Sequence, residues 1–363
     1  MKTAIILGTR AELIKSFPLI KRLDSRNNSI TFIGTGQHNL DNLCKKFGIK
    51  TPDYYLSEPV EESSRFNGSI FSAIMWSLSN IFKLRKVIDK DTDYVMFHGD
   101  TMSTSLAAIG TSFPFYNFKK FDKVHVEAGL RSGNIFEPFP EELSRILVDF
   151  LSDINIAVSK DAADNISKLR YLGKEIVPLG NTIQDSLREM LNQKRDFKKE
   201  YGIVTIHRHE NLSNKERMEK IITILEKSGL NLIFPMHDNT RNALEEYGLL
   251  EKIENNSNIE IRDLIDYPEF VNLMSESKIL FTDGGSIQEE SVILGIPCVI
   301  FRNKTERKEE LKEEINFLSN FREKETLEFV KKATSGEISK KRLNNQEEGS
   351  VSERIIEYLE NRL

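Results

Sequence analysis

Short apolar runs alternate with amphipathic stretches along the whole chain. In its first half, several runs have the length and composition of buried strands: Thr3–Leu7, Ser29–Ile33, Tyr94–His98, Lys123–Glu127 and Ile154–Ser159. Helical patterns separate some of these runs, at Ala11–Leu23 and Glu142–Leu151. Strands that alternate with helices form βαβ units and therefore a parallel sheet. The first half thus predicts one α/β domain.

The second half repeats this alternation. Its expected strands are Ile203–His207, Asn231–Met236, Ile259–Arg262, Lys278–Asp283 and Cys298–Phe301. Its expected helices are Asn214–Lys227, Thr240–Glu246, Ile287–Leu294 and Glu325–Lys332. We therefore expect two doubly wound Rossmann-like domains, over residues 1–172 and 173–349. A last helix within residues 350–363 has no strand partner and is expected to pack back on the first domain.

Composition and charge narrow the function classes. The 51 Lys and Arg residues nearly balance the 56 Asp and Glu residues, which argues against a nucleic-acid-binding protein with a large basic surface. The longest apolar runs are too short for a signal peptide or a membrane span. Only two cysteines are present, Cys44 and Cys298, so a disulfide framework is not expected. We expect a cytoplasmic protein of two domains.

Polar residues gather where the expected strands end, which is where open α/β sheets bind ligands. Gly8, Thr9 and Arg10 follow the first strand; the glycine permits a tight turn, and Arg10 is suited to hold a phosphate with two hydrogen bonds. The alternative is a plain strand-to-helix turn, because the segment is neither a GxGxxG fingerprint nor a Walker loop. Asp100 follows the strand that ends at His98, either as a functional carboxylate or as a helix N-cap.

The densest group of charges surrounds one strand end and one helix start. It contains Glu127, Arg131, Glu137, Glu141 and Arg145. Glu141 and Arg145 are four residues apart, so they share a helical face and are spaced to pair. The alternative for this pair is a surface ion pair worth under about 1 kcal/mol. Carboxylates crowded in this way suit acid–base chemistry.

Histidines stand at strand ends in the second half. His207 ends one expected strand, and no metal-ligand spacing such as HExxH accompanies it, so we expect phosphate contact or acid–base chemistry and no metal. His237 lies at a similar strand end, where a structural role fits equally well.

A glycine-rich loop precedes another expected helix. Gly284 and Gly285 expose backbone N–H groups, and Ser286 lies near the helix cap, as in a diphosphate cradle. Glu289 and Glu290 are expected in the first turn of that helix. There, one carboxylate is placed to accept hydrogen bonds from ribose hydroxyls, or both only interact favourably with the helix dipole.

Together these segments resemble the UDP-N-acetylglucosamine 2-epimerase family, in order and spacing, over nearly the whole chain. The matching segments are Gly8-Thr9-Arg10 with Lys15, His98-Gly99-Asp100-Thr101, His125-Val126-Glu127-Ala128-Gly129-Leu130-Arg131, Pro140-Glu141-Glu142 with Arg145, Gly180-Asn181-Thr182, His207-Arg208 with Glu210, and Gln288-Glu289-Glu290.

The resemblance implies a GT-B type architecture, in which two Rossmann-like domains face a central cleft. It also implies a UDP-sugar substrate, no cofactor and a homodimer. By position, the UDP-binding residues are Arg10, His207, Gly285, Ser286 and Glu290; we add Gly284, Arg131 and His237 to the substrate-binding set. The sugar-end and catalytic residues are Lys15, Asp100, Glu127, Glu141, Arg145 and His207.

The family eliminates UDP across C1–C2 of UDP-GlcNAc to leave a 2-acetamidoglucal, and re-addition gives UDP-ManNAc. One alternative is a hydrolysing epimerase that releases a free ManNAc-type sugar and UDP, and another is a GT-B glycosyltransferase. A non-catalytic UDP-sugar-binding module is a further alternative, which would not need Asp100, Glu127 and Glu141 together. The opening segment Gly8–Lys15 favours the non-hydrolysing branch.

The chain also departs from the family pattern. The family's Asp-Ser-Gly-Gly segment is Asp283-Gly284-Gly285-Ser286 here, so the serine is displaced. The segment Gln37–Asp41 is two residues shorter than in the family, and His209 replaces an arginine. In bacterial members the last two regions serve an allosteric site for a second UDP-sugar, so we do not expect that regulation here.

Overall fold

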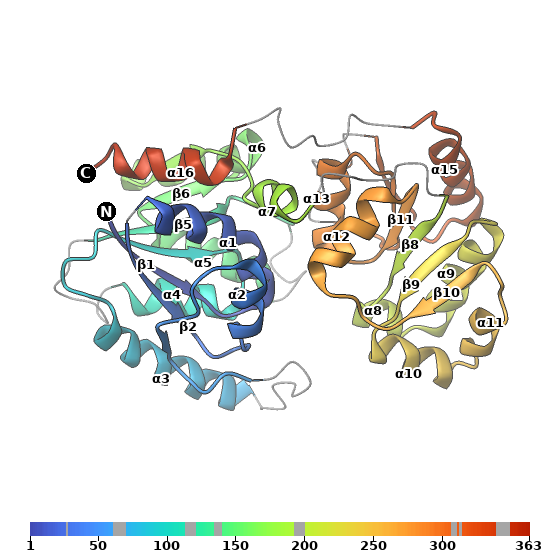
Figure 1. The fold of residues 1–363 in the computed structure, drawn as a ribbon, viewed down its shortest axis with the longest axis horizontal. Helices are drawn as coiled ribbons and strands as arrows, with labels where there is room; N and C mark the ends of the chain where they lie inside the picture. Colours follow the sequence, from blue (N-terminus) through green and yellow to red (C-terminus); the bar gives the residue numbers. More distant parts are fainter. Residues whose placement is uncertain are drawn as a thin grey trace. The chain divides into compact units, whose positions relative to one another are not determined.

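The computed structural model describes residues 1–26, 28–60, 70–112, 121–133, 140–191, 200–305, 311, 314–338 and 349–363, with the side chains of residues 70–75 left out. The chain forms two compact units (Figure 1). Unit 1 consists of Met1–Ser186 and Gly349–Leu363, and unit 2 of Leu187–Glu348. Among the residues that the structure describes, we find no helix with the length and hydropathy that a membrane crossing requires.

Unit 1 is built on a seven-stranded sheet in the order β3-β2-β1-β4-β5-β6-β7. The strands are β1 (Lys2–Leu7), β2 (Ser29–Gly34), β3 (Tyr54–Tyr55), β4 (Tyr94–His98), β5 (Asp122–Ala128), β6 (Ile154–Ala157) and β7 (Glu175–Pro178). All neighbouring strands pair in parallel. The central strands are nearly continuous apolar runs, because a parallel sheet with helices on both faces buries both sides of each strand.

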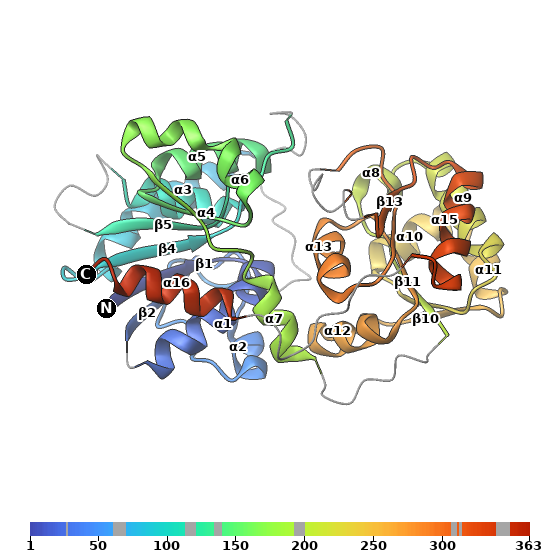
Figure 2. The same ribbon diagram turned by 90° about the horizontal axis from the view of Figure 1, so that it is seen from above.

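Helices cover both faces of this sheet. They are α1 (Arg10–Ser25), α2 (Asp41–Phe47), α3 (Ile70–Val87), α4 (Met102–Gly110), α5 (Glu141–Leu151), α6 (Lys160–Asn165), a 3₁₀ helix (Ser167–Leu172) and α16 (Val351–Glu360). Helix α7 (Ile183–Met190) begins in unit 1 and ends in unit 2. One apolar core joins α1, α2 and α16 to the sheet, and a second joins α3, α4 and α5. Figures 1 and 2 show α16, in red, alongside α1.

Unit 2 repeats the design with a six-stranded parallel sheet in the order β10-β9-β8-β11-β12-β13. The strands are β8 (Gly202–Thr205), β9 (Leu232–Pro235), β10 (Ile259–Arg262), β11 (Ile279–Thr282), β12 (Cys298–Ile300) and β13 (Asn316–Leu318). The helices are α8 (His209–Leu212), α9 (Lys215–Lys227), α10 (Asp238–Glu246), α11 (Leu250–Glu254), α12 (Tyr267–Glu276), α13 (Gly285–Leu294) and α15 (Glu323–Ser335). Counted from its first strand, each sheet contains the order 3-2-1-4-5-6 of a Rossmann fold.

The observed sheets confirm the predicted fold class of two Rossmann-like domains. The division between the units falls after Ser186, whereas the sequence analysis placed it after residue 172. The reason is β7, which was not predicted: it pairs with β6 and therefore carries the chain through one more strand of the first sheet. Helix α16 belongs to unit 1, where Asp185 accepts hydrogen bonds from the backbone N–H groups of Val351 and Ser352.

Candidate functional site

Some of the candidate residues in each unit lie beyond the carboxyl ends of the two strands at which the strand order reverses. In unit 1 this reversal lies between β1 and β4, and in unit 2 between β8 and β11. Arg10 follows β1 and Asp100 follows β4, whereas His207 follows β8 and Gly284 follows β11. Open α/β sheets bind ligands at such points, so each unit has its own candidate site.

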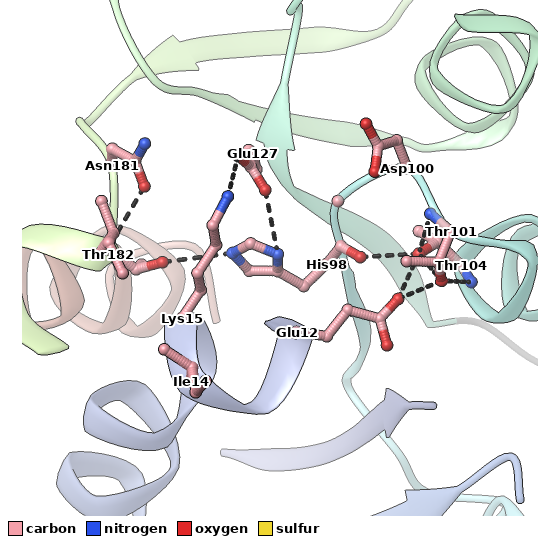
Figure 3. Close-up of polar contacts among 12 residues, drawn as sticks. Glu12, Ile14, Lys15, His98, Asp100, Thr101, Thr104, Glu127, Asn181 and Thr182 are labelled. Carbon is pink, nitrogen blue, oxygen red and sulfur yellow. Dashed lines mark hydrogen bonds and ion pairs between the residues drawn. The ribbon is translucent and has the colours of Figure 1, made fainter. Parts of the chain in front are cut away.

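Glu127 is the central residue of the unit 1 site (Figure 3). Its backbone has a φ of 72°, in the left-handed region that non-glycine residues rarely adopt, and the pairing of β5 with β6 shifts between Val126 and Ala128. Its buried carboxylate accepts a hydrogen bond from Lys15 Nζ at 2.5 Å. Backbone strain of this kind clusters at functional sites, where it aims a side chain.

His98 lies on the other side of this carboxylate. Its Nδ1 is 3.4 Å from Glu127 Oε2, and its Nε2 is 3.3 Å from Thr182 Oγ1 (Figure 3). Burial lowers the pKa of His98 to about 3, although the Glu127 carboxylate opposes this shift. The ring is therefore neutral near pH 7, with Nδ1 toward the carboxylate and Nε2 toward the threonine hydroxyl.

Arg145 holds the second carboxylate of the site, Asp100. Its Nη2 is 2.6 Å and its Nε 2.8 Å from Asp100 Oδ2, and its Nη1 is 3.1 Å from Glu142 Oε2. Burial lowers the pKa of Arg145, but the two carboxylates more than offset this and raise it. Arg145 is thus a fixed cation beside Asp100.

The expected pairing of Glu141 with Arg145 is not what the structure has. Arg145 points to the buried side of α5, and Glu142 lies on that same side, one turn earlier. Glu141 is only partly buried, and its Oε2 has no hydrogen-bond partner in the part of the chain that the structure describes. Glu137 lies outside the described residues.

Glu12 occupies the position at which the sequence analysis expected an anion near the start of α1. Its Oε2 accepts hydrogen bonds from the backbone N–H groups of Gly8 and Thr9, at 2.7 and 2.9 Å. Its Oε1 accepts hydrogen bonds from the hydroxyls of Thr101 and Thr104 (Figure 3). Burial raises the pKa of Glu12. These N–H groups are therefore committed to Glu12, and the Arg10 side chain is what this loop offers to a phosphate.

Asp283 braces the corresponding loop of unit 2. It is fully buried and accepts hydrogen bonds from the backbone N–H groups of His207 and Arg208 and from Asn211 Nδ2, at 3.0–3.1 Å. The His207 ring itself is about half exposed. A methyl group at Gly284 would come within 3.3 Å of that ring, so the glycine leaves it room.

Helix α13 begins at Gly285, directly after Gly284 as its N-cap. The glycine cap has no side chain to cover the first N–H groups of the helix, which is the arrangement expected of a diphosphate cradle. Ser286 is exposed at the second helical position. Glu289 and Glu290 lie in the second turn rather than the first, because the helix begins earlier than predicted; Glu290 is buried and accepts a hydrogen bond from Tyr267 Oη at 2.7 Å.

A pocket opens beside His207 at the carboxyl ends of β8 and β9. Its lining residues are Thr205, Ile206, His207, Pro235, His237, Leu264, Ile265, Phe270 and Ile287. His237 also caps α10, since its Nδ1 accepts a hydrogen bond from the backbone N–H of Asn239. The pocket combines an aromatic ring and aliphatic walls with two imidazoles, as expected of a site for a flat heterocycle.

A family model described as UDP-N-acetylglucosamine 2-epimerase matches residues 21–360. The chain belongs to this family. It is 34% identical to UDP-N-acetylglucosamine 2-epimerase from Methanococcus maripaludis, over 91% of each chain. The structure of Methanocaldococcus jannaschii UDP-GlcNAc 2-epimerase in complex with UDP-GlcNAc and UDP is similar with a TM-score of 0.79 and 30% identity, covering 99% of this chain and 100% of that chain.

The epimerase fold extends to a more distant protein. The lipopolysaccharide outer core galactosyltransferase WaaB is similar with a TM-score of 0.56 and 11% identity, over 100% of both chains, which is a likeness of fold alone. These comparisons confirm the GT-B type architecture and the family that the sequence motifs indicated. They identify the chain as a member of a family of isomerases.

The candidate site contains residues that sequence reasoning missed. Asp149 contacts His125 and Arg131, Tyr267 contacts Glu290, and Phe270 lines the pocket. Asp149 and Phe270 lie inside helices with no motif around them, so nothing in the pattern marked them. In the part of the chain that the structure describes, no group of His, Cys, Asp and Glu side chains is arranged to hold a metal ion.

Proposed function

We propose that this chain interconverts UDP-GlcNAc and UDP-ManNAc by eliminating UDP to a 2-acetamidoglucal and adding it back. The observation that carries the proposal is the buried cluster of Glu127, Lys15 and His98 (Figure 3), next to the Asp100–Arg145 pair. A carboxylate aimed by a strained backbone and flanked by an ammonium and a neutral imidazole is equipped to take and return a proton.

The reaction needs two proton transfers at C2, on opposite faces of the sugar. As a base removes the C2 proton, the C1–O bond breaks and its electron pair leaves with UDP. On return, the UDP oxygen bonds to C1 and C2 receives a proton on the other face. We assign these transfers to Asp100, Glu127 and Glu141, with Lys15 and Arg145 as the cations that stabilise the ionised carboxylates.

Unit 2 holds the nucleotide in this proposal. The uncovered N–H groups at the start of α13, in Gly285 and Ser286, receive the diphosphate, with Gly284 keeping the loop open for His207. Glu290 faces the ribose, and the pocket containing His237 and Phe270 holds the uracil ring. Arg10 and Arg131 are further cations of the proposed substrate-binding set. The M. jannaschii complex with UDP-GlcNAc and UDP supports this substrate class.

The predicted homodimer fits an unusual helix surface. Helix α5 buries Glu142, Arg145 and Asp149 but exposes Leu143 and Ile146. With the neighbouring helices α3 and α4 it forms an apolar face of exposed side chains, namely Leu78, Phe82, Met102, Leu143, Ile146 and Phe150. Exposed apolar faces mark subunit interfaces, so we expect two copies to join through this face.

Sedimentation of Phe150→Glu tests the dimer. We expect the wild type to sediment as a dimer and Phe150→Glu as a monomer, because a buried charge opposes association. Tyr171→Glu, which replaces another exposed aromatic outside the face, should remain a dimer. A monomeric wild type would contradict the proposal. The cytoplasmic location expected from the cysteine content stays a prediction.

Proton NMR in deuterated water tests the reaction. With UDP-GlcNAc as substrate, we expect UDP-ManNAc to appear while the C2 proton signal is lost from both sugars. Free N-acetylmannosamine with UDP would instead indicate the hydrolysing branch. Transfer of the sugar to an added acceptor would indicate a glycosyltransferase, and an unchanged spectrum would contradict all three enzyme readings for this substrate.

A further inference from the structure

Asp149 of α5 is a buried carboxylate that the proposed mechanism does not use. None of it is exposed to solvent. Its Oδ1 lies 2.7 Å from His125 Nδ1, and its Oδ2 lies 2.7 Å from Arg131 Nη2. A buried charge is costly unless it is paired and hydrogen-bonded, and replacing such a group by apolar residues is often neutral or stabilising. We therefore expect the Asp149 carboxylate to serve a role other than stabilising the fold.

The His125 ring shows what this carboxylate controls. Its second nitrogen, Nε2, lies 2.8 Å from the carbonyl oxygen of Gly99, which only accepts hydrogen bonds. Nε2 therefore donates to Gly99. Nδ1 faces the Asp149 carboxylate, which also lies against the Arg131 guanidinium. This arrangement favours a ring that donates from both nitrogens, to Asp149 on one side and to Gly99 on the other.

Gly99 is the turn that places Asp100. Its φ of 75° lies in the left-handed region, and its N–H donates to Val126 O at 2.9 Å. With its carbonyl held by His125, the backbone on both sides of this glycine is fixed. Asp100 follows directly, and its carboxylate is held by Arg145 from the same helix as Asp149. Helix α5 therefore holds Asp100 in two ways, at the side chain and at the backbone.

We propose that Asp149 is a positioning residue for the epimerase reaction, acting through His125 on the Gly99–Asp100 turn and through Arg131 on the loop that follows β5. The inference rests on the proposed function. Both contacts start from one carboxylate, and both end on segments that carry proposed site residues, Asp100 on one side and Arg131 on the other. Removing the charge releases both segments together.

Steady-state kinetics of Asp149→Asn test the proposal. The amide has nearly the same shape but only one acceptor oxygen, so it cannot hold the His125 ring and the Arg131 guanidinium at once. Because misplacement of a reacting group by about 1 Å costs about 10²-fold in rate, we expect kcat to fall by about that factor. We expect KM for UDP-GlcNAc and the Kd for UDP to change less than about threefold, because the proposed nucleotide-binding groups lie mostly on unit 2.

Asp153→Asn is the matched control. Asp153 also pairs with two cations, since its carboxylate lies 3.6 Å from Lys123 Nζ and 3.2 Å from Lys174 Nζ, but it lies at the amino ends of β5 and β6. A purely structural role for Asp149 predicts similar kinetics for the two variants. We expect wild-type kcat from Asp153→Asn. Equal kcat values for wild type and folded Asp149→Asn would overturn the proposal, whereas an inactive wild type would overturn the proposed function.

NMR of the His125 ring keeps the proposal testable if Asp149→Asn does not fold. In the wild type, selectively labelled His125 should show a proton on both ring nitrogens. Observation of a single ring proton would contradict the geometry from which the inference starts. Asp149→Glu, which keeps the charge on a longer side chain, should retain both ring protons and recover part of the kcat lost in Asp149→Asn.

Discussion

In each unit an aspartate follows the fourth strand of the sheet, Asp100 in unit 1 and Asp283 in unit 2. The two aspartates have opposite environments. Asp100 follows β4, has a side chain that is 29% exposed, and is held by the guanidinium of Arg145. Asp283 follows β11, is fully buried, and is occupied by the backbone N–H groups of His207 and Arg208. One carboxylate remains available for chemistry, whereas the other only braces a loop.

This difference extends to the rest of each site. Unit 1 presents charged side chains, Glu127 and Asp100, each next to its own cation. Unit 2 presents backbone N–H groups at α13 and a pocket with largely apolar walls. Charged groups near a reacting centre change barriers, whereas N–H groups and apolar walls bind substrate and product alike. In the function that we propose, the same fold thus supplies the catalytic groups in unit 1 and the nucleotide-binding groups in unit 2.

Replacing Asp100 gives the largest expected effect. Asp100→Asn removes a proton-transfer group but keeps a hydrogen-bond acceptor for Arg145, so we expect kcat to fall by about 10²- to 10⁴-fold. The Kd for UDP should stay within about threefold of the wild type. Stopped assays of epimerisation and calorimetric titration with UDP measure the two quantities. Loss of UDP affinity with unchanged kcat would reverse the roles that we assign to the two units.

Replacing Phe270 tests the binding role of unit 2. Phe270→Ala removes an aromatic wall of the pocket, and burial of a ring of this size is worth about 1.5–3 kcal/mol. We expect the Kd for UDP to rise by about 10- to 100-fold, with kcat at saturating substrate close to the wild type. Leu264→Ala, at the same pocket, is the control for loss of an aliphatic wall and should weaken UDP binding less. Unchanged UDP affinity in both variants would place the uracil ring elsewhere.

The sequence predicts these sheets well because their strands are short, almost uniformly apolar runs. β7 was missed for a physical reason: at the sheet edge only Ile176 of its four residues is buried, so the run Glu175–Pro178 does not look like a strand. β13 was not predicted either, and it also lies at the edge of its sheet. The domain boundary was misplaced as a direct consequence of missing β7, since the chain remains with the first sheet through that strand.

Helix α5 shows why the site could be predicted only in part. Sequence spacing indicates which residues share a helical face, but an apolar stripe is normally assigned to the core. Here the polar stripe is buried and Leu143, Ile146 and Phe150 are exposed. Arg145 therefore finds Asp100, which comes from a distant part of the sequence. Family motifs selected the candidate residues, but only the fold shows which of them are partners.

Replacing Asp283 tests whether this residue stabilises the His207 loop rather than taking part in the reaction. Asp283→Asn replaces a buried acceptor of several hydrogen bonds by an amide with one acceptor oxygen, which costs about 1–3 kcal/mol of stability when buried groups lose partners. We expect this loss in urea unfolding of unit 2, together with weaker UDP binding because the His207 loop is released. Asp100→Asn, the equivalent substitution in unit 1, should cost less stability. Equal stability losses would remove the contrast between the two aspartates.

The smallest expected effect is the loss of folding stability of unit 1 at low pH that His98 causes. Because burial lowers the pKa of His98 to about 3 from an ordinary value near 6.5, the unfolded chain binds a proton between these values that the folded chain does not. The stability due to the neutral ring is therefore complete above pH 6.5 and is lost as the pH falls toward 3, by up to about 1.4 kcal/mol per pH unit. The raised pKa of Glu12 changes stability with pH in the opposite direction, but this contribution cancels when wild type and His98→Asn are compared.

Hydrogen exchange between pH 5 and 6 tests this expectation. The amides of β4 should show a larger pH dependence in the wild type than in His98→Asn, and the amides of β11 should show no difference between the two proteins. Identical pH dependence in β4 would mean that the His98 ring is not held neutral beside Glu127, and the proton-transfer cluster of unit 1 would then need a different charge assignment.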